Sequence, residues 1–535
     1  MALFETLVAL LLISALLLQL SRKLRVPYPT LLALAGTVFA ALPWAPQVGI
    51  DPALALVLFV APAILSAAFD TSPHELRRNL VPLVALAVFA VLLTTAAVAW
   101  AGVAVAGLPL AAAVALGAIV APPDAAAAQA MLGNLGLPRR LMVVLQGESL
   151  FNDAVALIIF GAAVALAQGG VRPIELLPQL ALAVPGGILL GAVTATAFIA
   201  LRRNWAGTLG VTILEFSATF LVWMTAEHLH VSPVLAMVTH AMVAARSAPW
   251  RQDARDRQHS YAVWDAAVFI LNVLAFLLMG LQARAILAQM EGHALWQALG
   301  FAALVFGIVV AVRLAWVMSY RYVFAPFAGR LACPSQDDGN ARLRLIVSWC
   351  GMRGILTLAT ALSLPLAFPG RNLIVLSAFA VVLGTLVVQG ATVALLMRWL
   401  GIEPDRSLDD DVEAARTILA DARRQALRGD TAPLLAWSVP VESIAVFRPP
   451  HLPPAAGYRR LDASSSFDVM LDDGLVEPTP ADERRLAIVA AERYALNALH
   501  RRGDLAEDAF RVLQQELDWR ELALMPRHAR ELGET

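Results

Sequence analysis

Residues 145–160 read LQGESLFNDAVALIIF, which places four polar side chains inside a run that is otherwise apolar enough to cross a membrane. They are Glu148, Ser149, Asn152 and Asp153. An ionised side chain near the middle of a bilayer costs roughly 2.5–3.5 kcal/mol on insertion scales. Two carboxylates within six positions therefore require partners, a water-filled cavity or a function.

The spacing of these four residues predicts how they are arranged on a helix. Residues four apart share one face. Ser149 therefore lies above Asp153, and Glu148 lies above Asn152 on the adjacent stripe. The sequence predicts a polar wedge two stripes wide, and this wedge is the first candidate functional site.

The composition indicates a membrane protein with a soluble end. Of the 535 residues, 59% are hydrophobic and 15% are charged, whereas soluble domains carry about 25% charged residues. Residues 1–404 hold 23 basic and 17 acidic side chains, and residues 405–535 hold 17 basic and 24 acidic ones. The sequence therefore predicts a transmembrane domain over 1–404 and a mildly acidic C-terminal domain over 405–535. The two cysteines, Cys333 and Cys350, have no spacing that indicates a metal site or a disulfide framework.

Runs of about 20 apolar residues are long enough to cross a bilayer. Thirteen are expected, near residues 2–21, 28–43, 52–69, 80–103, 109–133, 139–168, 173–201, 207–228, 231–245, 261–287, 294–324, 343–365 and 371–399. No basic residue precedes the first run, so we expect a retained helix rather than a cleaved signal peptide. The fold class predicted is an all-α polytopic membrane protein.

Basic residues are concentrated in alternate loops between these runs. One set of loops carries Arg22, Lys23, Arg25, Arg77, Arg78, Arg139, Arg140, Arg202, Arg203, Arg251, Arg255, Arg257, Arg330, Arg342, Arg344 and Arg398. The other set carries little beyond Arg172, Arg284 and Arg371. Because cytoplasmic loops are enriched in Lys and Arg, the N-terminus is expected outside and the C-terminal domain in the cytoplasm.

Two of the thirteen helices are expected to be broken. The fifth contains Ala121-Pro122-Pro123-Asp124, and proline lacks an amide donor and clashes with the preceding turn. The twelfth contains SWCGMRG at 348–354, with two glycines and a buried arginine. Helices 4–6 and 11–13 (about 80–168 and 294–399) thus form two triplets, each with a disrupted middle helix. Such pairs indicate inverted repeats and a transport site, although the two triplets share no visible sequence repeat.

Beyond residue 404 the pattern becomes that of a small helical domain. Helices are expected over 408–428 and 482–524, the second range as two helices around Arg502-Gly503-Asp504. Tyr494, Leu499, Leu513 and Leu517 would pack this hairpin. The stretch between, with Ser464-Ser465-Ser466, is expected to be irregular. A regulatory or assembly module and a passive extension both remain open.

The motifs GESLFND, a proline–aspartate break and GMRG resemble the sodium/proton antiporters, more narrowly the bacterial type of the electroneutral branch of the monovalent cation–proton antiporters. The segments LRRNLVPLVALAVFAVLLTT and GNLGLPRRL extend the resemblance across the membrane body. It implies a homodimer in the bacterial inner membrane, acting in pH homeostasis. It also implies a dimerisation unit of helices 1–3 and 7–10, and a mobile core of helices 4–6 and 11–13 that moves like an elevator.

The resemblance also implies roles for individual residues. Asp153 would exchange a proton for the cation, and Ser149 and Asp124 would hold Na+ with it. The backbone carbonyl of Pro123 would be a further ligand, where the family usually has threonine. Asn152 occupies the position of a second aspartate in the electrogenic branch, although it equally suits capping the carbonyls of a broken helix.

A structural ion pair between Glu148 and Arg353 is the remaining implied role. Arg313 is instead expected near the end of its span, where long side chains reach the membrane surface. The chain also departs from the family in the third span. There Ser66 stands where an acidic residue is common, with Asp70 about one turn further along, so both are possible additional site residues.

The expected function is secondary active Na+/H+ antiport. A hard monovalent cation prefers oxygen ligands, and one carboxylate can hold a proton or a cation but poorly both. A K+/H+ antiporter, an uncoupled channel and a non-transporting sensor on the same scaffold remain alternatives. No enzyme is expected, because the spans contain no H-E-x-x-H motif. No cofactor is expected beyond the transported ions, and the expected partners are lipid and monovalent cations rather than nucleic acid.

Overall fold

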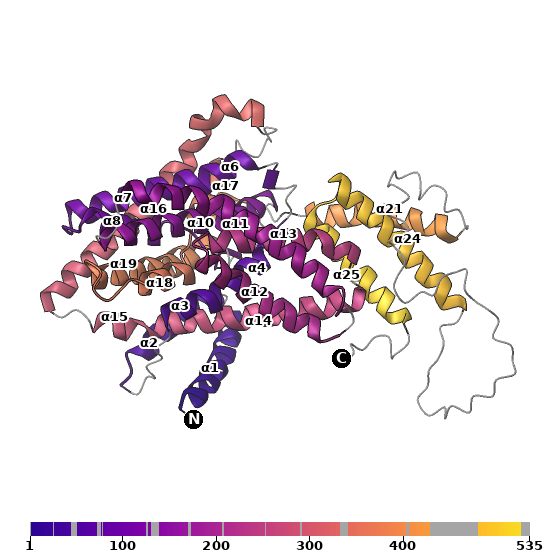
Figure 1. The fold of residues 1–535 in the computed structure, drawn as a ribbon, viewed down its shortest axis with the longest axis horizontal. Helices are drawn as coiled ribbons and strands as arrows, with labels where there is room; N and C mark the ends of the chain where they lie inside the picture. The colour runs from indigo at the N-terminus through magenta and orange to yellow at the C-terminus, as the bar shows by residue number, and fades with distance from the viewer. Residues whose placement is uncertain are drawn as a thin grey trace. The chain divides into compact units, whose positions relative to one another are not determined.

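The fold is helical. The computed structural model describes residues 2–24, 26–43, 51–71, 76–77, 79–124, 127–129, 139–168, 173–205, 208–251, 253–288, 292–331, 341–402, 405, 407–427 and 480–525. Within these ranges the regular structure consists of helices, as Figure 1 shows, and no strand forms there. The all-α prediction is confirmed.

Two compact units make up the chain. The first comprises Met1–Phe198, Phe216–Ala244 and Trp264–Asp405, and the second comprises Ile199–Glu215, Ala245–Val263 and Arg406–Thr535. The second unit therefore combines the chain from residue 406 onward with the ends of several long apolar helices.

A helix, or a run of consecutive helices, lies at every predicted span. They are α1 (Ala2–Leu24), α2 (Tyr28–Ala40), α3 (Pro52–Ala55) with η1 (Leu56–Val60) and α4 (Ala61–Phe69), α6 (Leu80–Val84) with η2 (Ala85–Ala90) and α7 (Val91–Ala104), α8 (Leu110–Val120), α10 (Arg139–Ala167), α11 (Pro173–Arg202), α12 (Gly210–His228), α13 (Pro233–Arg251), α14 (Ala254–Leu281) with α15 (Ala283–Leu287), α16 (Gly292–Leu331), α17 (Ala341–Trp349) with α18 (Ile355–Leu362), and α19 (Arg371–Gly384) with η4 (Thr385–Gln389) and α20 (Gly390–Leu400).

Length and hydropathy single out the spans that can cross a bilayer unaided. Among the described residues six helical segments qualify, and four shorter apolar helices accompany them. A chain with this many apolar helices is a multi-pass membrane protein. The count of thirteen crossings stays a prediction.

Both predicted helix breaks are confirmed. Helix α8 ends at Val120, immediately before the two prolines, and residues 350–354 separate α17 from α18. The two breaks are joined, because the backbone N–H of Asp124 donates to the carbonyl of Met352 at 2.7 Å. Non-helical backbone at membrane depth requires such partners, since no water is available to it in the hydrocarbon.

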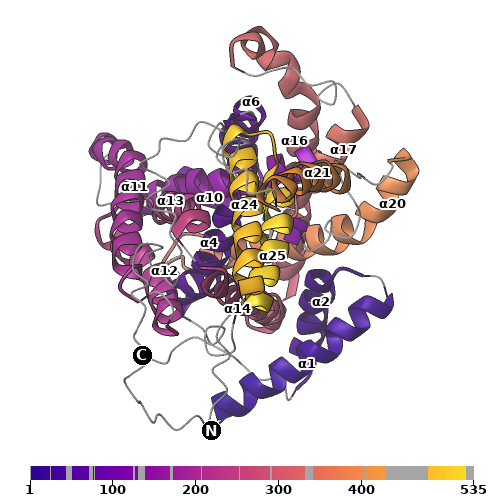
Figure 2. The same ribbon diagram turned by 90° about the vertical axis from the view of Figure 1, so that its right-hand side faces the viewer.

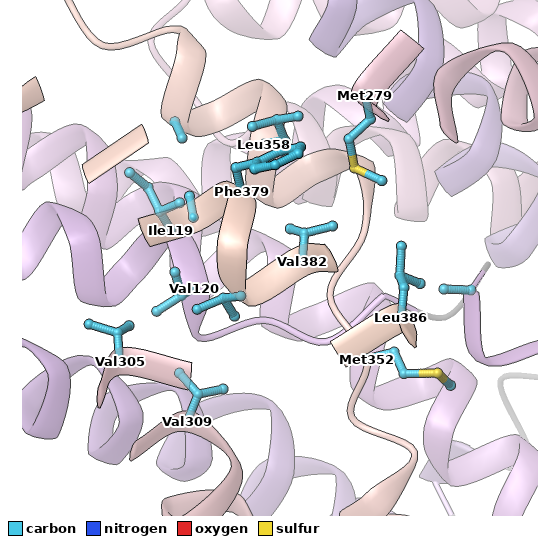
Figure 3. Packing of buried hydrophobic residues seen from close by; sticks show 14 of the residues in the cluster. Ile119, Val120, Met279, Val305, Val309, Met352, Leu358, Phe379, Val382 and Leu386 are labelled. Carbon is cyan, nitrogen blue, oxygen red and sulfur yellow. The ribbon is translucent and has the colours of Figure 1, made fainter. Parts of the chain in front are cut away.

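The breaks lie within the main hydrophobic core of the first unit. Figure 3 shows Ile119 and Val120 of α8 in one hydrophobic cluster with side chains of α16, α18, α19 and η4. Small residues allow the close approach of α8 to α7: a Cβ on Gly117 would lie 2.8 Å from the Cα of Thr95. This dense packing fixes the end of α8, and with it the start of the Pro122-Pro123 segment.

The C-terminal part of the second unit forms a bundle of three helices, α21 (Ser407–Leu427), α24 (Pro480–Arg502) and α25 (Glu507–Leu524). They lie side by side in Figure 2, where α24 and α25 are yellow. Leu499, Leu513 and Leu517 share their buried cluster, as predicted, and Tyr494 of α24 is half-buried. The helical predictions are confirmed, while Ser464-Ser465-Ser466 and Cys333 lie outside the described residues.

Candidate cation site

A cavity of about 110 Å³ lies in the first unit, beside both helix breaks. Its walls come from η1, α4, α10, α14 and α18 and from the segment after α8. The predicted site residues that line it are Ser66, Asp70, Pro123, Asp124, Ser149 and Asp153. The fold therefore brings three carboxylates to one cavity: Asp153 from α10, Asp124 from the break after α8 and Asp70 from the end of α4.

The wedge on α10 divides into two stripes with different surroundings. Ser149 and Asp153 form the stripe that lines the cavity, and each is 8% exposed. Glu148 and Asn152 form the other stripe, with no exposed surface at all. The two-stripe arrangement predicted from the helical spacing is confirmed, and only one stripe can meet an ion from solution.

Asn152 contacts the broken segment directly. Its Nδ2 donates to the carbonyl oxygen of Pro123 at 3.5 Å, while none of the described residues donates to its Oδ1. The amide thus caps a carbonyl that the break leaves without an intrahelical donor. This contact holds the Pro123 carbonyl in place beside the cavity that Pro123 lines.

The carboxylate of Glu148 forms a two-pronged ion pair with Arg313 of α16. The Nη1–Oε1 distance is 2.5 Å and the Nη2–Oε2 distance is 2.9 Å, and both side chains are buried. The predicted pairing of Glu148 with Arg353 is wrong, as is the placement of Arg313 at a membrane surface. Helix α16 continues to Leu331, so Arg313 sits well inside it.

Arg353 instead caps the end of α8. Its Nε donates to the Val120 carbonyl at 2.9 Å, its Nη2 to the Ala121 carbonyl at 3.1 Å, and its Nη1 to the Gly351 carbonyl. The last carbonyls of a helix lack intrahelical donors and carry partial negative charge. A buried guanidinium with five donors satisfies several of them at once, which explains why it needs no carboxylate.

The family follows from the comparison with known proteins. Residues 8–399 match the family described as "Sodium/hydrogen exchanger, transmembrane". The chain belongs to the sodium/hydrogen exchanger family. This is a family of transporters, in agreement with the expectation that the chain is not an enzyme.

Relatives of this exchanger include an uncharacterized Na(+)/H(+) exchanger of Mycobacterium tuberculosis, 31% identical over 95% of the chain and 93% of the relative. A sodium, potassium, lithium and rubidium/H(+) antiporter of Bacillus pumilus is 30% identical over 75% of the chain and 61% of the relative. The structure also matches that of the sodium proton antiporter MjNhaP1 of Methanocaldococcus jannaschii, with a TM-score of 0.59 and 18% identity. The match covers 75% of this chain and 100% of the MjNhaP1 chain. The exchanger therefore has the MjNhaP1 fold.

Two of the cavity residues lie in or directly after the third predicted span. Ser66 of α4 is half-buried in the wall, and Asp70, which follows α4, is exposed. The cavity therefore has no acidic side chain at the Ser66 position. A carboxylate lies about one turn further along, on the more exposed side of the wall.

Three polar residues of the cavity wall are absent from the predicted set: Gln129, Asn272 of α14 and Thr357 of α18. Asn272 carried a signal, because it is an amide inside the apolar run FILNVLAF. Thr357 and Gln129 do not stand out in the sequence. Threonine is common in apolar helices, and Gln129 lies in the segment after the Pro122-Pro123 break. Among the described residues no group of three His, Cys, Asp or Glu side chains could hold a metal ion.

Gly354 is required by the position of Asp124. A Cβ at residue 354 would overlap the Asp124 carboxylate and lie 2.8 Å from its Cβ, so the whole side chain would have to move. We expect Gly354→Ala to abolish cation-driven proton movement in proteoliposomes. The matched control is Gly161→Ala on α10, where a Cβ meets nothing within 4 Å. Transport at the unmodified rate in Gly354→Ala would show that Asp124 need not occupy its observed place.

Proposed function

We propose that this exchanger moves a monovalent cation, Na+ foremost, in exchange for H+, with Asp153 as the group that binds either ion. The observation that carries the proposal is the single cavity that Asp153 and Asp124 line beside two joined helix breaks. Broken helices at a midplane site are the hallmark of secondary transporters. The resemblance to named antiporters supports the same function.

The cavity offers the ligands that a hard cation requires. Carboxylates of Asp124 and Asp153 and the hydroxyl of Ser149 are oxygen donors, the class that suits such cations. The Pro123 carbonyl would complete the set from the broken backbone, held by the Asn152 amide. Because a carbonyl is present in any residue, the absence of the family's usual threonine at this position leaves that ligand intact.

Competition at one carboxylate would produce the exchange. A proton on Asp153 removes the negative charge that attracts the cation, so the two ions exclude one another. Glu148 is paired with Arg313 and Asn152 carries no charge, so Asp153 is the one carboxylate of the wedge that lines the cavity. One proton for one cation, an electroneutral stoichiometry, follows if the protein crosses between its two faces only when Asp153 is occupied.

We further propose that residues 1–404 form the transport body of a homodimer, with a mobile core of about 80–168 and 294–399 and a dimer interface on the other helices. The C-terminal domain, 405–535, would lie in the cytoplasm and the N-terminus outside, in a bacterial inner membrane. The asymmetry of basic residues between alternate loops supports this orientation.

Potassium is the second candidate cation. A relative 30% identical is named for sodium, potassium, lithium and rubidium. Ser66 supports a broader range as well, because a neutral hydroxyl in the wall attracts a small cation less strongly than a carboxylate at that position would. An uncoupled channel or a non-transporting sensor on the same scaffold would differ from an antiporter in a flux assay.

The test is a flux assay with purified protein in proteoliposomes, run in turn with Na+, Li+ and K+. Antiport predicts cation-driven proton movement that persists when the membrane potential is clamped. A channel would pass current instead, and a sensor would show neither signal. Either of these outcomes would overturn the proposal.

Competition also predicts how the response depends on pH. Where the proton occupies the site, each unit of decrease in pH should raise the half-saturating Na+ concentration about tenfold, because one proton must leave per cation bound. The measurement is the initial rate as a function of Na+ concentration at several pH values. A half-saturating concentration that is independent of pH over that whole range would mean that the two ions use separate sites.

A further inference from the structure

A buried cluster of charges joins helix α14 to the C-terminal hairpin within the second unit. Arg257 of α14 donates to Asp518 of α25 through Nε at 3.0 Å and through Nη2 at 2.5 Å. Arg493 of α24 also donates to Asp518, at 2.6 Å, and to Glu521, at 2.5 Å. Arg257 is 2% exposed and Asp518 is not exposed at all. Residues 261 positions apart are thus bound by a desolvated ion pair.

Neighbouring polar contacts tie the other helix ends of this unit to α14. Arg202, at the end of α11, lies 3.4 Å from Glu215 of α12. The hydroxyl of Ser260, one turn after Arg257 on α14, donates to the same Glu215 at 2.5 Å. A contact that restrains Arg257 therefore also restrains a polar network that includes residues of α11, α12 and α14.

The charges in the cluster balance only when all of its members are present. Two guanidinium groups meet two carboxylates, and Asp518 is the only residue that receives hydrogen bonds from both α14 and α24 among the described contacts. Removal of one partner from a buried ion pair leaves an uncompensated charge, which is far costlier than losing an exposed pair. The same helix α25 carries an exposed pair, Glu516 with Arg416 of α21, for comparison.

Helix α14 continues from this cluster to the cation cavity. Arg257 and Asn272 belong to the same unbroken helix, Ala254–Leu281, and Asn272 lines the cavity with Val268. The 15 positions between Arg257 and Asn272 span about 22 Å at 1.5 Å per residue. A change in how α14 is held at Arg257 would therefore shift a polar residue of the cavity wall.

We propose that Asp518 is the anchor by which the hairpin α24–α25 holds α14, and that this hold keeps Asn272 in the position that favours cation binding. The C-terminal domain is then a built-in element that sets cation affinity, rather than a passive extension. The effect on cation affinity rests on the proposed antiport function. The anchoring of α14 by Asp518 does not rest on it, because amide hydrogen exchange measures the anchoring without transport.

The test uses the full chain with Asp518→Asn, which leaves Arg257 buried without its carboxylate. We expect amide hydrogen exchange over residues 507–524 to rise about tenfold or more as the anchor opens locally. The half-saturating Na+ concentration for flux should rise about threefold or more, since a helix displaced at one end carries its cavity residue with it. Glu516→Gln is the matched control on the same helix, and it should change neither value.

A second variant separates loss of the anchor from general misfolding. Arg257→Met combined with Asp518→Leu removes both charges while Arg493 keeps Glu521, so exchange should return toward the unmodified level. The proposal is overturned if Asp518→Asn exchanges like Glu516→Gln, or if the hairpin loosens without a change in half-saturating Na+. If the unmodified protein transports nothing, the antiport proposal fails, while hydrogen exchange still decides whether Asp518 is the anchor.

Discussion

Asp153→Asn is expected to reduce cation-driven proton movement to the rate of protein-free liposomes. Asparagine keeps the size of the side chain but cannot take up or release a proton at any relevant pH. It also removes one of the three carboxylates that line the cavity, leaving Asp124 and Asp70. Both halves of the exchange therefore fail together, so neither raising the Na+ concentration nor changing the pH should restore transport.

The matched control for this variant is another acid-to-amide change in an apolar helix. Glu227 of α12 accepts a hydrogen bond from Nε1 of Trp223 at 2.8 Å and is not part of the cavity wall. Glu227→Gln keeps an acceptor for that bond, so its flux should match the unmodified protein. Both proteins should elute as folded particles in detergent, which excludes misfolding as the cause of the difference.

Arg313→Met is expected to destabilise the protein by about 3–5 kcal/mol, the cost of leaving the buried carboxylate of Glu148 without its partner. Two short hydrogen bonds join the pair, and neither side chain reaches solvent. The loss should appear as a lower thermal unfolding temperature in detergent. Combining Arg313→Met with Glu148→Leu should recover most of the stability, because two apolar side chains can replace a buried ion pair.

Arg353 provides the contrast for this experiment. Its guanidinium donates to carbonyls at the end of α8, so Glu148→Leu should leave the cost of Arg353→Met unchanged. If Glu148→Leu instead compensated for the loss of Arg353 and not for the loss of Arg313, the observed pairing would be contradicted.

The helix breaks and the polar wedge could be predicted because local chemistry determines them. The Pro122-Pro123 pair predicts the end of α8 just before it, because proline has no amide donor for the helix, and α8 does end at Val120. The period of the α-helix alone places Ser149 over Asp153 on one stripe. Six long apolar helices were likewise evident within the described part of the chain, since hydropathy reports burial in lipid directly.

The partner of Glu148 could not be predicted, because it depends on how distant helices pack. Arg313 and Arg353 are both arginines in apolar runs, and the sequence does not say which guanidinium faces α10. The predicted span 294–324 also placed Arg313 too close to an end, whereas α16 extends to Leu331. Asn272 is visible in the sequence as an amide inside an apolar run, but its contact with the cavity depends on the placement of α14.

The central claim is that one carboxylate, Asp153, binds the cation and the proton in alternation. Its most direct test is proton release on adding NaCl to purified protein in weakly buffered detergent solution, with choline chloride as the salt control. The account predicts about one proton released per chain, at a pH where Asp153 is protonated, and none from Asp153→Asn. Sodium binding without proton release, or equal release from Asp153→Asn, would contradict it.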